Sequence, residues 1–361
     1  MKNQKVKLYN KLDKDLITQW KLLWNHSEFA HPFNSLEWFK VCLEVFKIGK
    51  FFIFTLERQK EVEAIFPLVS ISHYGVRVFA SPGGKYLDKS TLLVKKRGNK
   101  TVSILFDTLS RYGNLYLAEL DEYMLDPIVK NSDNFFALRS GVTPYIVINP
   151  NPLRFLSKKQ KSKILNRYKR FENDLKYEHD SKKPHTVINL DLISSKAQKG
   201  KATFSDKYSQ LLLKKCKKLM PENFLIHLLS YKNNPIIYAA GFVWKKNYLG
   251  VWTAYHPDFK HLLPGKILLY KLLNKLQSDG VENFWFGRGD STLKKEFTPY
   301  KDQQYDLYFT KNKFIKYWWK SLYYLKKFVL EHENYYAFYL RLKRYITRSH
   351  RFNLKIKGAL L

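Results

Sequence analysis

The fold is decided by residues 237–294, which read IYAAGFVWKKNYLGVWTAYHPDFKHLLPGKILLYKLLNKLQSDGVENFWFGRGDSTLK. Apolar side chains alternate over 237–244 and again over 248–255, and a short polar break separates the two runs. Period-two alternation of this kind predicts a β-hairpin. An amphipathic helix and a third strand at 283–286 follow the hairpin. The stretch therefore predicts strand, strand, helix and strand in that order.

The helix in this stretch begins at Pro264 and Gly265, and Gly280 ends it. Proline suits the first helical position, and glycine allows a second backbone or a ligand to come close. A strand that leads into a helix through such a turn leaves backbone amides that could hold an anion. The turn is thus a candidate phosphate site.

The third strand ends in the turn Gly287-Arg288-Gly289-Asp290. Two glycines permit tight turning at the end of a strand, where ligands of α/β proteins tend to bind. Lys294 lies four residues after Asp290, so in a helix the two side chains would share a face and could pair. Lys294 could also offer a cation to phosphate or carboxylate. The alternative is a structural turn with a surface ion pair.

The composition indicates a packed and strongly basic protein. The chain has 361 residues, 45% of them hydrophobic, and 64 Lys and Arg against 31 Asp and Glu, for a net charge of +33. This length suffices for two domains. The charge favours an anionic partner, whether nucleic acid, a phosphate-bearing small molecule or an acidic membrane, unless lysine-rich coding bias is its source. Cys42 and Cys216 stand far apart, which excludes a disulfide scaffold and a cysteine zinc site.

The elements are predicted to follow the same order twice, which gives mixed sheets in which neighbouring strands can diverge. In the first half we expect helices at 14–25, 35–46 and 101–112, and strands at 51–57, 62–70, 76–81, 114–120, 135–138 and 145–148. In the second half we expect helices at 157–175 and 204–219, and strands at 186–192, 224–231 and 305–310, around the stretch quoted above.

Two basic segments flank this second half. Residues 157–175 form a basic helix in which Arg167 could contact phosphate, although a solvated amphipathic helix is the default interpretation. Residues 314–353 combine aromatic side chains with lysine and arginine, the composition of a helix at a membrane surface. The alternative is that these aromatic side chains pack on the second domain.

Several other site classes lack their motifs. The histidines show no metal-ligand spacing, and the sequence has no HExxH motif, no Gly-x-Ser-x-Gly elbow and no Walker loop. We therefore expect no metal site. We also find no stretch with the length of a signal-peptide core or a membrane span, so we expect a cytoplasmic protein, with peripheral contact at the inner face of the membrane as an option.

With these motifs in hand, the sequence resembles the GNAT acyltransferases. More narrowly it resembles the bacterial CelD/BcsL-like branch (cellulose-biosynthesis-protein-like, with a BioF2-like acetyltransferase domain), which is related to the Fem peptidyltransferases. The resemblance rests on a strand ending near Tyr255, the Pro264-Gly265 turn, and Phe286-Gly287-x-Gly289-Asp290 followed by Lys294. Supporting segments are 144–148, 166–172 and Ser81-Pro-Gly-Gly84 before Tyr86-Leu87-Asp88.

The resemblance implies an α/β (α+β) fold of two tandem GNAT-like domains, with mixed and mainly antiparallel sheets flanked by helices. The expected limits are 1–150 for a degenerate N-terminal domain, 151–312 for the acyltransferase domain and 313–361 for a basic helical tail. It further implies a thioester donor, acetyl-CoA or another acyl-CoA, whose pantetheine arm enters between the strands at 250–255 and 283–286.

The resemblance also assigns roles to particular residues. Asp290 and Tyr255 are the candidate catalytic residues, and no metal takes part. The donor pyrophosphate would lie at Pro264, Gly265, Lys266 and Ile267, and the substrate would contact Gly287, Gly289, Lys294 and Arg167.

Three functions follow as hypotheses. The first is N- or O-acetyl transfer to a sugar or amino-sugar precursor of cell-envelope or exopolysaccharide biosynthesis, with the acyl donor and the glycan precursor as partners. The second is a Fem-like aminoacyl transfer from aminoacyl-tRNA, which the positive charge favours. The third is a non-catalytic basic protein that binds nucleic acid or, through its tail, anionic membrane.

Overall fold

The computed structural model describes residues 4–59, 61–96, 99–125, 128, 133–148 and 151–332. Its strands form a 13-stranded sheet in the order β1-β2-β3-β4-β6-β13-β7-β12-β11-β10-β9-β8, with β5 paired to β3. The strands are β1 Gln4–Tyr9, β2 Phe51–Arg58, β3 Glu61–His73, β4 Val76–Ala80, β5 Leu93–Val94, β6 Leu115–Asp121, β7 Phe135–Val147, β8 Leu175–Glu178, β9 Phe224–Tyr231, β10 Asn234–Trp244, β11 Asn247–Tyr255, β12 Asn283–Trp285 and β13 Lys301–Phe309.

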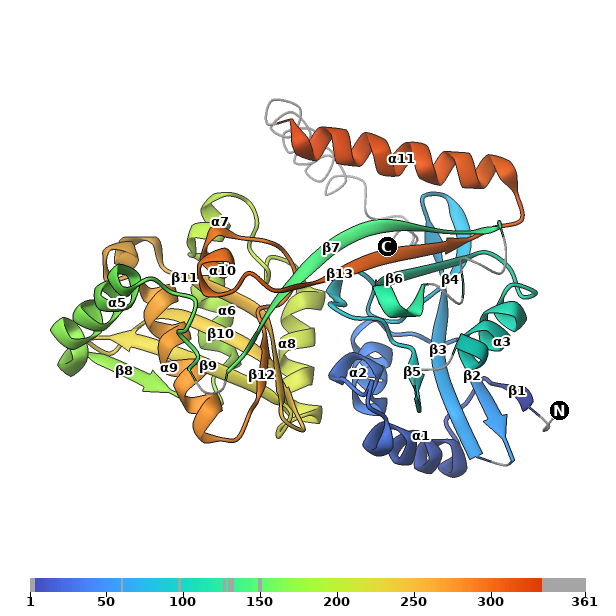
Figure 1. Cartoon of the computed structure of the whole chain (residues 1–361), viewed down its shortest axis with the longest axis horizontal. Coiled ribbons are helices and arrows are strands. Elements are labelled where there is room, and N and C mark those ends of the chain that lie inside the picture. Colours follow the sequence, from blue (N-terminus) through green and yellow to red (C-terminus); the bar gives the residue numbers. More distant parts are fainter. Residues whose placement is uncertain are drawn as a thin grey trace.

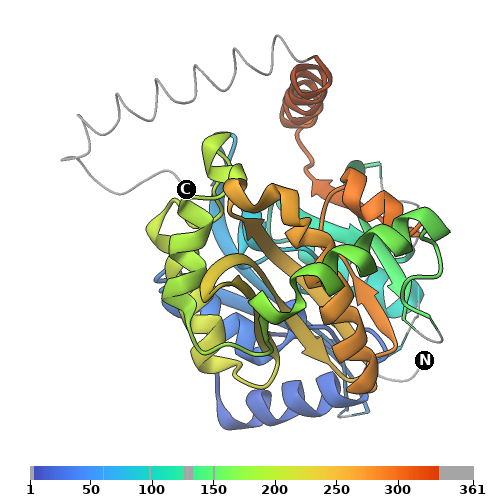
Figure 2. The same cartoon turned by 90° about the vertical axis from the view of Figure 1, so that its left-hand side faces the viewer.

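Helices cover this sheet. They are α1 Lys14–His26, α2 Leu36–Val45, α3 Asn99–Leu109, α5 Lys158–Phe171, α6 Pro184–Leu192, α7 Ser195–Gln198, α8 Lys207–Leu219, α9 Pro264–Ser278, α10 Thr292–Phe297 and α11 Lys313–Glu331. In the second half, α6 and α8 pack on one face of the strands and α5 and α9 on the other (Figure 2).

The order of elements repeats, as the sequence predicts. In the first half β2, β3 and β4 are antiparallel neighbours, and after α3 the chain returns in β6, which runs parallel to β4. In the second half β9, β10 and β11 are antiparallel, and after α9 the chain returns in β12, parallel to β11. The mixed α/β fold is thereby confirmed.

The last strand of each half lies next to the other half. β7 closes the first half in sequence, yet it pairs with β12 of the second half, and β13 lies between β6 and β7 (Figure 1). β13 falls within the segment 151–312, so the sheet crosses the limits predicted for the two domains. Those limits stay a prediction.

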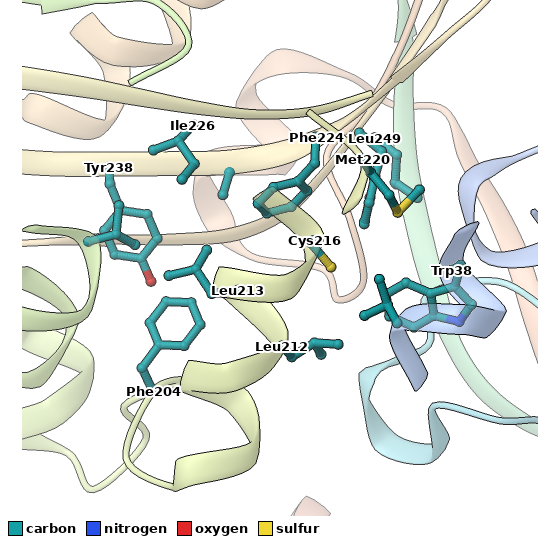
Figure 3. Packing of buried hydrophobic residues seen from close by; sticks show 14 of the residues in the cluster. Trp38, Phe204, Leu212, Leu213, Cys216, Met220, Phe224, Ile226, Tyr238 and Leu249 are labelled. Atoms are coloured by element: carbon teal, nitrogen blue, oxygen red, sulfur yellow. The ribbon is translucent and has the colours of Figure 1, made fainter. Parts of the chain in front are cut away.

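A shared hydrophobic cluster also joins the halves. Trp38 of α2 packs in one cluster with Leu212 and Cys216 of α8 and with Phe224 and Phe242 of β9 and β10 (Figure 3). Both cysteines lie buried in this cluster as free thiols.

The strand predicted at 186–192 is wrong, because these residues form α6. Pro184 begins the helix, and the buried side chains Val187, Leu190 and Asp191 recur at helical spacing. The Asp191 carboxylate accepts hydrogen bonds from the Phe204 amide at 2.8 Å and the Tyr238 hydroxyl at 2.7 Å. These tertiary contacts satisfy a polar group that the alternating pattern did not explain.

Other elements also differ from the prediction. The basic helix starts with a capping box between Ser157 and Gln160. It ends at Phe171 instead of 175, and the chain continues through a short 3₁₀ turn into β8. The strands predicted at 135–138 and 145–148 are one long strand, β7. The short strands β1, β5 and β8 were not predicted.

The C-terminal helix α11 packs on strands of both predicted segments, β4 and β7 of 1–150 and β13 of 151–312. Trp319 is buried against Val78, Phe136 and Tyr308, which belong to β4, β7 and β13. Residues 333–361, which complete the predicted tail, lie outside the described residues. Within the described ranges, no helix combines the length and hydropathy that crossing a bilayer requires.

Candidate functional site

The candidate site is the place where β11 and β12 separate. The two parallel strands pair only from Asn247 opposite Asn283 to Leu249 opposite Trp285. β11 then continues to Tyr255 while β12 ends, and a cleft of about 460 Å³ opens between them. Its lining includes Gly250, Val251, Thr253, Gly265, Leu269, Phe284, Phe286, Gly289, Asp290 and Lys294.

A β-bulge lies at the mouth of this separation. Across the hairpin, Trp252 pairs with Ala240 and Gly250 with Gly241, so Val251 has no ladder partner on β10. The extra residue of a bulge is left unpaired and the strand is re-aimed. Val251 thus lines the cleft without a ladder partner on β10, and no hydropathy or motif signal in the sequence marks it.

The glycine turn closes the opposite wall. Gly287 adopts φ +72°, and a Cβ atom there would lie 2.0 Å from the Gly250 carbonyl oxygen. Gly289 adopts φ +94°. Only glycine tolerates such a close approach together with a left-handed backbone, so the prediction of a tight turn at the end of the strand is confirmed for the backbone.

Lys294 and Asp290 both line the cleft, but they do not pair as expected. The Lys294 ammonium donates to the carbonyl oxygens of Gly287 and Arg288 at 2.7 Å and of Gly289 at 3.0 Å. Burial lowers the pKa of Lys294 to about 8. The Asp290 carboxylate lies 3.4 Å from the Lys295 ammonium. Since an ammonium has three hydrogens, this geometry favours a role for Lys294 in holding the turn.

A charged cluster that includes Asp88 and Glu119 of the first half lies behind the turn. The Asp88 carboxylate accepts the Arg288 amide, and burial raises the pKa of Asp88 to about 6. The Arg288 guanidinium binds Glu119 at 2.7 Å, and Ser140 donates to the same carboxylate at 3.1 Å. Burial raises the pKa of Glu119 to about 8, although Arg288 opposes this shift. Asp306 lies in the same cluster, and burial raises its pKa also.

Sequence reasoning missed these residues for a clear reason. Asp88 lies in a loop and Glu119 on β6, and Asp306 reaches them because β13 pairs with β6. Asp88 did stand in a segment marked by the family resemblance, and Arg288 stood inside the glycine turn, so these two could have been chosen.

The predicted pyrophosphate residues begin α9 and divide between cleft and core. Gly265 lines the cleft, whereas Pro264 and Ile267 are buried. The Lys266 ammonium lies 2.5 Å from the Glu296 carboxylate. The amides of Lys266 and Ile267 both donate to the Leu263 carbonyl, at 3.0 and 3.1 Å. Gly265 is thus the member of this set that faces the cleft.

Two predicted site residues lie away from the cleft. Tyr255 packs beside the cluster that contains Leu229 and Ile236, at the far end of β11. The Arg167 guanidinium lies 6.0 Å from the centre of the Phe171 ring on α5. Neither side chain lines the cleft. Among the described residues, no group of three or more His, Cys, Asp or Glu side chains is arranged to hold a metal ion.

Comparison with protein families identifies the class of protein that carries this cleft. Residues 158–302 match the family described as acetyltransferase (GNAT) domain, and this match includes β11, α9 and β12. The chain therefore carries a GNAT domain and is an enzyme of the acyltransferase class. The match does not distinguish the CelD/BcsL-like branch from others. No curated protein matches the chain in sequence.

Solved structures share the fold at low sequence identity. FemX superposes with a TM-score of 0.62 at 10% identity, covering 83% of this chain and 96% of that one. The C-terminal domain of a candidate lysylphosphatidylglycerol synthetase from Agrobacterium fabrum gives a TM-score of 0.54 at 11% identity, covering 87% and 95%. L-PGS from Bacillus licheniformis gives 0.51 at 10% identity, covering 78% and 93%. Such likeness establishes the two-half architecture over most of the chain.

Proposed function

We propose that this chain transfers an acyl group from an acyl-CoA, with acetyl-CoA as the first donor to test, to an amine or hydroxyl of a sugar or amino-sugar precursor in cell-envelope or exopolysaccharide biosynthesis. The observation that carries the proposal is the cleft between β11 and β12 with the unpaired Val251 at its mouth. Its largely apolar walls suit a pantetheine arm, and Gly265 lies where the helix N-terminus of α9 can meet the pyrophosphate.

The chemistry needs few groups. The acceptor nitrogen or oxygen attacks the thioester carbon, the carbon–sulfur bond breaks, and CoA leaves as the thiolate, which becomes the thiol by taking up the proton that the acceptor has given up. The Val251 amide supports the negative charge that develops on the carbonyl oxygen, because a positioned backbone donor stabilises such an oxyanion. Asp290, on the cleft wall, accepts the proton of the acceptor. Lys294 and the two glycines hold the turn that carries Asp290.

The test is acetyl-CoA binding by calorimetry together with transfer of radiolabelled acetyl groups to an extract of envelope precursors. Val251→Pro removes the proposed donor amide at a bulge, where proline is tolerated in sheets. We expect its turnover number to fall roughly 10²- to 10³-fold. Asp258→Asn, on an exposed side chain, is the control for a substitution distant from the cleft. Absence of both donor binding and labelling of any acceptor would exclude the acyl-CoA form of the proposal.

Aminoacyl-tRNA is the second candidate donor. The net charge of +33 and the likeness in fold to FemX and to the lysylphosphatidylglycerol synthetase domain support it. Specific tRNA binding should persist at moderate salt, since non-specific phosphate contacts weaken steeply as counterions compete. Binding that vanishes with salt, without any aminoacyl transfer, would remove this donor.

We also propose that α11 contacts an anionic membrane surface from one side. Its outer face exposes Phe314, Tyr317, Trp318, Tyr324, Leu325 and Phe328, and Lys313, Lys316, Lys320, Lys326 and Lys327 lie on the same helix. Aromatic rings at the headgroups beside lysines are typical of interfacial helices. Vesicle flotation should retain the full chain with anionic lipid and lose Tyr317→Ser/Phe328→Ser. Equal flotation of both proteins, or flotation with neutral lipid alone, would contradict this contact.

A further inference from the structure

A second cleft lies between the two halves of the molecule. It measures about 950 Å³, roughly twice the volume of the cleft between β11 and β12. His31 and Lys89 line it from the first half, Trp244 and Trp285 from the second, and Asp302 from the start of β13. A cavity of this size can hold a small polar molecule.

This inter-half cleft is acidic although the protein is strongly basic. Its walls carry Glu28, Asp121, Glu122 and Asp302 against Lys89 and Lys301. Lys89 is paired with Asp121 at 3.3 Å. The excess of carboxylates in a chain of net charge +33 favours a cationic ligand and disfavours phosphate-rich ligands here.

An aromatic wall stands beside these carboxylates. The rings of Trp244 and Trp285 stack with their centres 5.9 Å apart, and the Trp285 indole donates to Asp302 at 2.8 Å. The Lys89 ammonium lies 5.7 Å from the centre of the Trp285 ring. This wall thus already accepts one ammonium group in the way that aromatic faces bind cations.

His31 adds a buried polar side chain to the wall of the inter-half cleft. Its side chain lines the cleft although the residue is only 6% exposed, and its buried Nδ1 has no hydrogen-bond partner among the described residues. Burial and the nearby Lys89 charge lower the pKa of His31 well below its usual value. The imidazole is therefore neutral at physiological pH and has the capacity to accept a hydrogen bond from a bound donor.

The two clefts share strand β12, from which successive side chains point to opposite faces of the sheet. Trp285 forms the last ladder pair before β11 and β12 separate, and it is a wall of the inter-half cleft. Its neighbours Phe284 and Phe286 line the cleft between the strands. The loop that places Asp88 behind the glycine turn places the next residue, Lys89, in the inter-half cleft.

We propose that the inter-half cleft binds the acyl acceptor as a compact polar molecule with a primary ammonium group, of which an amino sugar is the nearest example, held by Asp302 and Glu122 beside the tryptophan wall. The word acceptor rests on the proposed function, whereas recognition of the ammonium group does not. In this cleft a neutral sugar lacks the group that the carboxylates recognise.

The test uses D-glucosamine as the probe, with D-glucose and N-acetyl-D-glucosamine as ligands that lack the ammonium group. Binding to the full chain is followed by quenching of tryptophan fluorescence and by the shift in Tm. Asp302→Asn removes the charge but keeps an oxygen that accepts the hydrogen bond of the Trp285 indole. Glu122→Gln likewise removes the charge and keeps an oxygen that accepts the hydrogen bond of the Tyr305 hydroxyl. Each should weaken glucosamine binding about tenfold, as expected for loss of a charge-assisted hydrogen bond.

The control Asp258→Asn should bind glucosamine as the unaltered chain does. Equal binding of glucosamine and glucose, no binding of glucosamine, or unchanged affinity in both charge-removing variants would overturn the inference. Acetyl-CoA binding, measured on the same samples, separates the two proposals. Selective glucosamine binding without any acetyl-CoA binding would contradict the proposed donor and leave the ammonium site standing. Acetyl-CoA binding without selective glucosamine binding would contradict the ammonium site and leave the proposed donor standing.

Discussion

At the scale of the residue, Gly287 is the position where the least chemical change should have the largest effect. Gly287→Ala would place a Cβ atom 2.0 Å from the Gly250 carbonyl oxygen on a backbone with φ +72°. The left-handed backbone alone costs about 1–2 kcal/mol, and the overlap adds to it. We expect the free energy of unfolding, measured with urea, to fall by more than about 2 kcal/mol. Gly49→Ala, where a Cβ meets nothing within 4 Å, is the matched control.

The raised pKa of Glu119 predicts how the free energy of unfolding depends on pH. Its pKa is about 8 in the folded protein against 4.5 ordinarily, so between these values the folded state keeps a proton that the unfolded state has released. The contribution of Glu119 to stability is therefore fully present below pH 4.5 and is lost as pH rises towards 8. The Glu119→Gln variant lacks this titration. Between these pH values its free energy of unfolding should therefore fall by less than that of the unaltered chain, and the two decreases should differ by more than about 1 kcal/mol.

Exposed Glu44→Gln should keep the pH profile of the unaltered chain, because Glu44 lies outside the buried cluster. If Glu119→Gln also kept that profile, Glu119 would be ionised with Arg288 throughout the range, and the burial argument would be wrong.

At the scale of the element, α11 has two faces with opposite consequences. Trp319 is 1% exposed and packs on the sheet. Tyr317, one of the aromatic side chains on the outer face, is 68% exposed. Trp319→Ala should destabilise the docked helix by about 3–5 kcal/mol. Tyr317→Ala should change stability by no more than about 0.5 kcal/mol. Limited proteolysis within α11 and urea unfolding measure both, and equal susceptibility of the two variants would show that the helix is not held through Trp319.

The sequence predicted those elements that local sequence signals define, and it failed where tertiary contacts define the element. The hairpin, α9 and β12 were predictable because alternation, Pro264 and Gly280 are local signals. The strand at 186–192 failed because Asp191 finds its partners, Phe204 and Tyr238, only in the tertiary structure. In the candidate site, the glycine turn was predictable, whereas the bulge at Val251 depends on cross-strand register, which a single strand's sequence does not contain.

At the scale of the whole molecule, the exchanged strands β7 and β13 make the two halves one structure. Leu307 and Phe309 of β13 are buried in the core of the first half, and Ile146 of β7 is buried in the core of the second. The packing of Trp38 against α8 in a shared hydrophobic cluster is a second contact between the two halves. Asp88 of the first half accepts the Arg288 amide in the glycine turn of the candidate site, although Asp88 lies outside residues 158–302, which match the GNAT domain.

This arrangement predicts that the sequence limits do not give two independent folding units. A fragment of residues 1–150 lacks β13, which leaves Leu117 and Phe135 without their neighbours Leu307 and Phe309 and leaves facing edges on β6 and β7. We expect this fragment to aggregate or to show no cooperative thermal unfolding, since an unpaired apolar edge is an aggregation site. Fusion of residues 299–312 to its end through a flexible linker supplies β13 and should restore a cooperative transition by circular dichroism. A linked β13 carrying Leu307→Asp and Phe309→Asp is the control and should not restore it. Cooperative folding of 1–150 alone would show that β13 is dispensable to the first half.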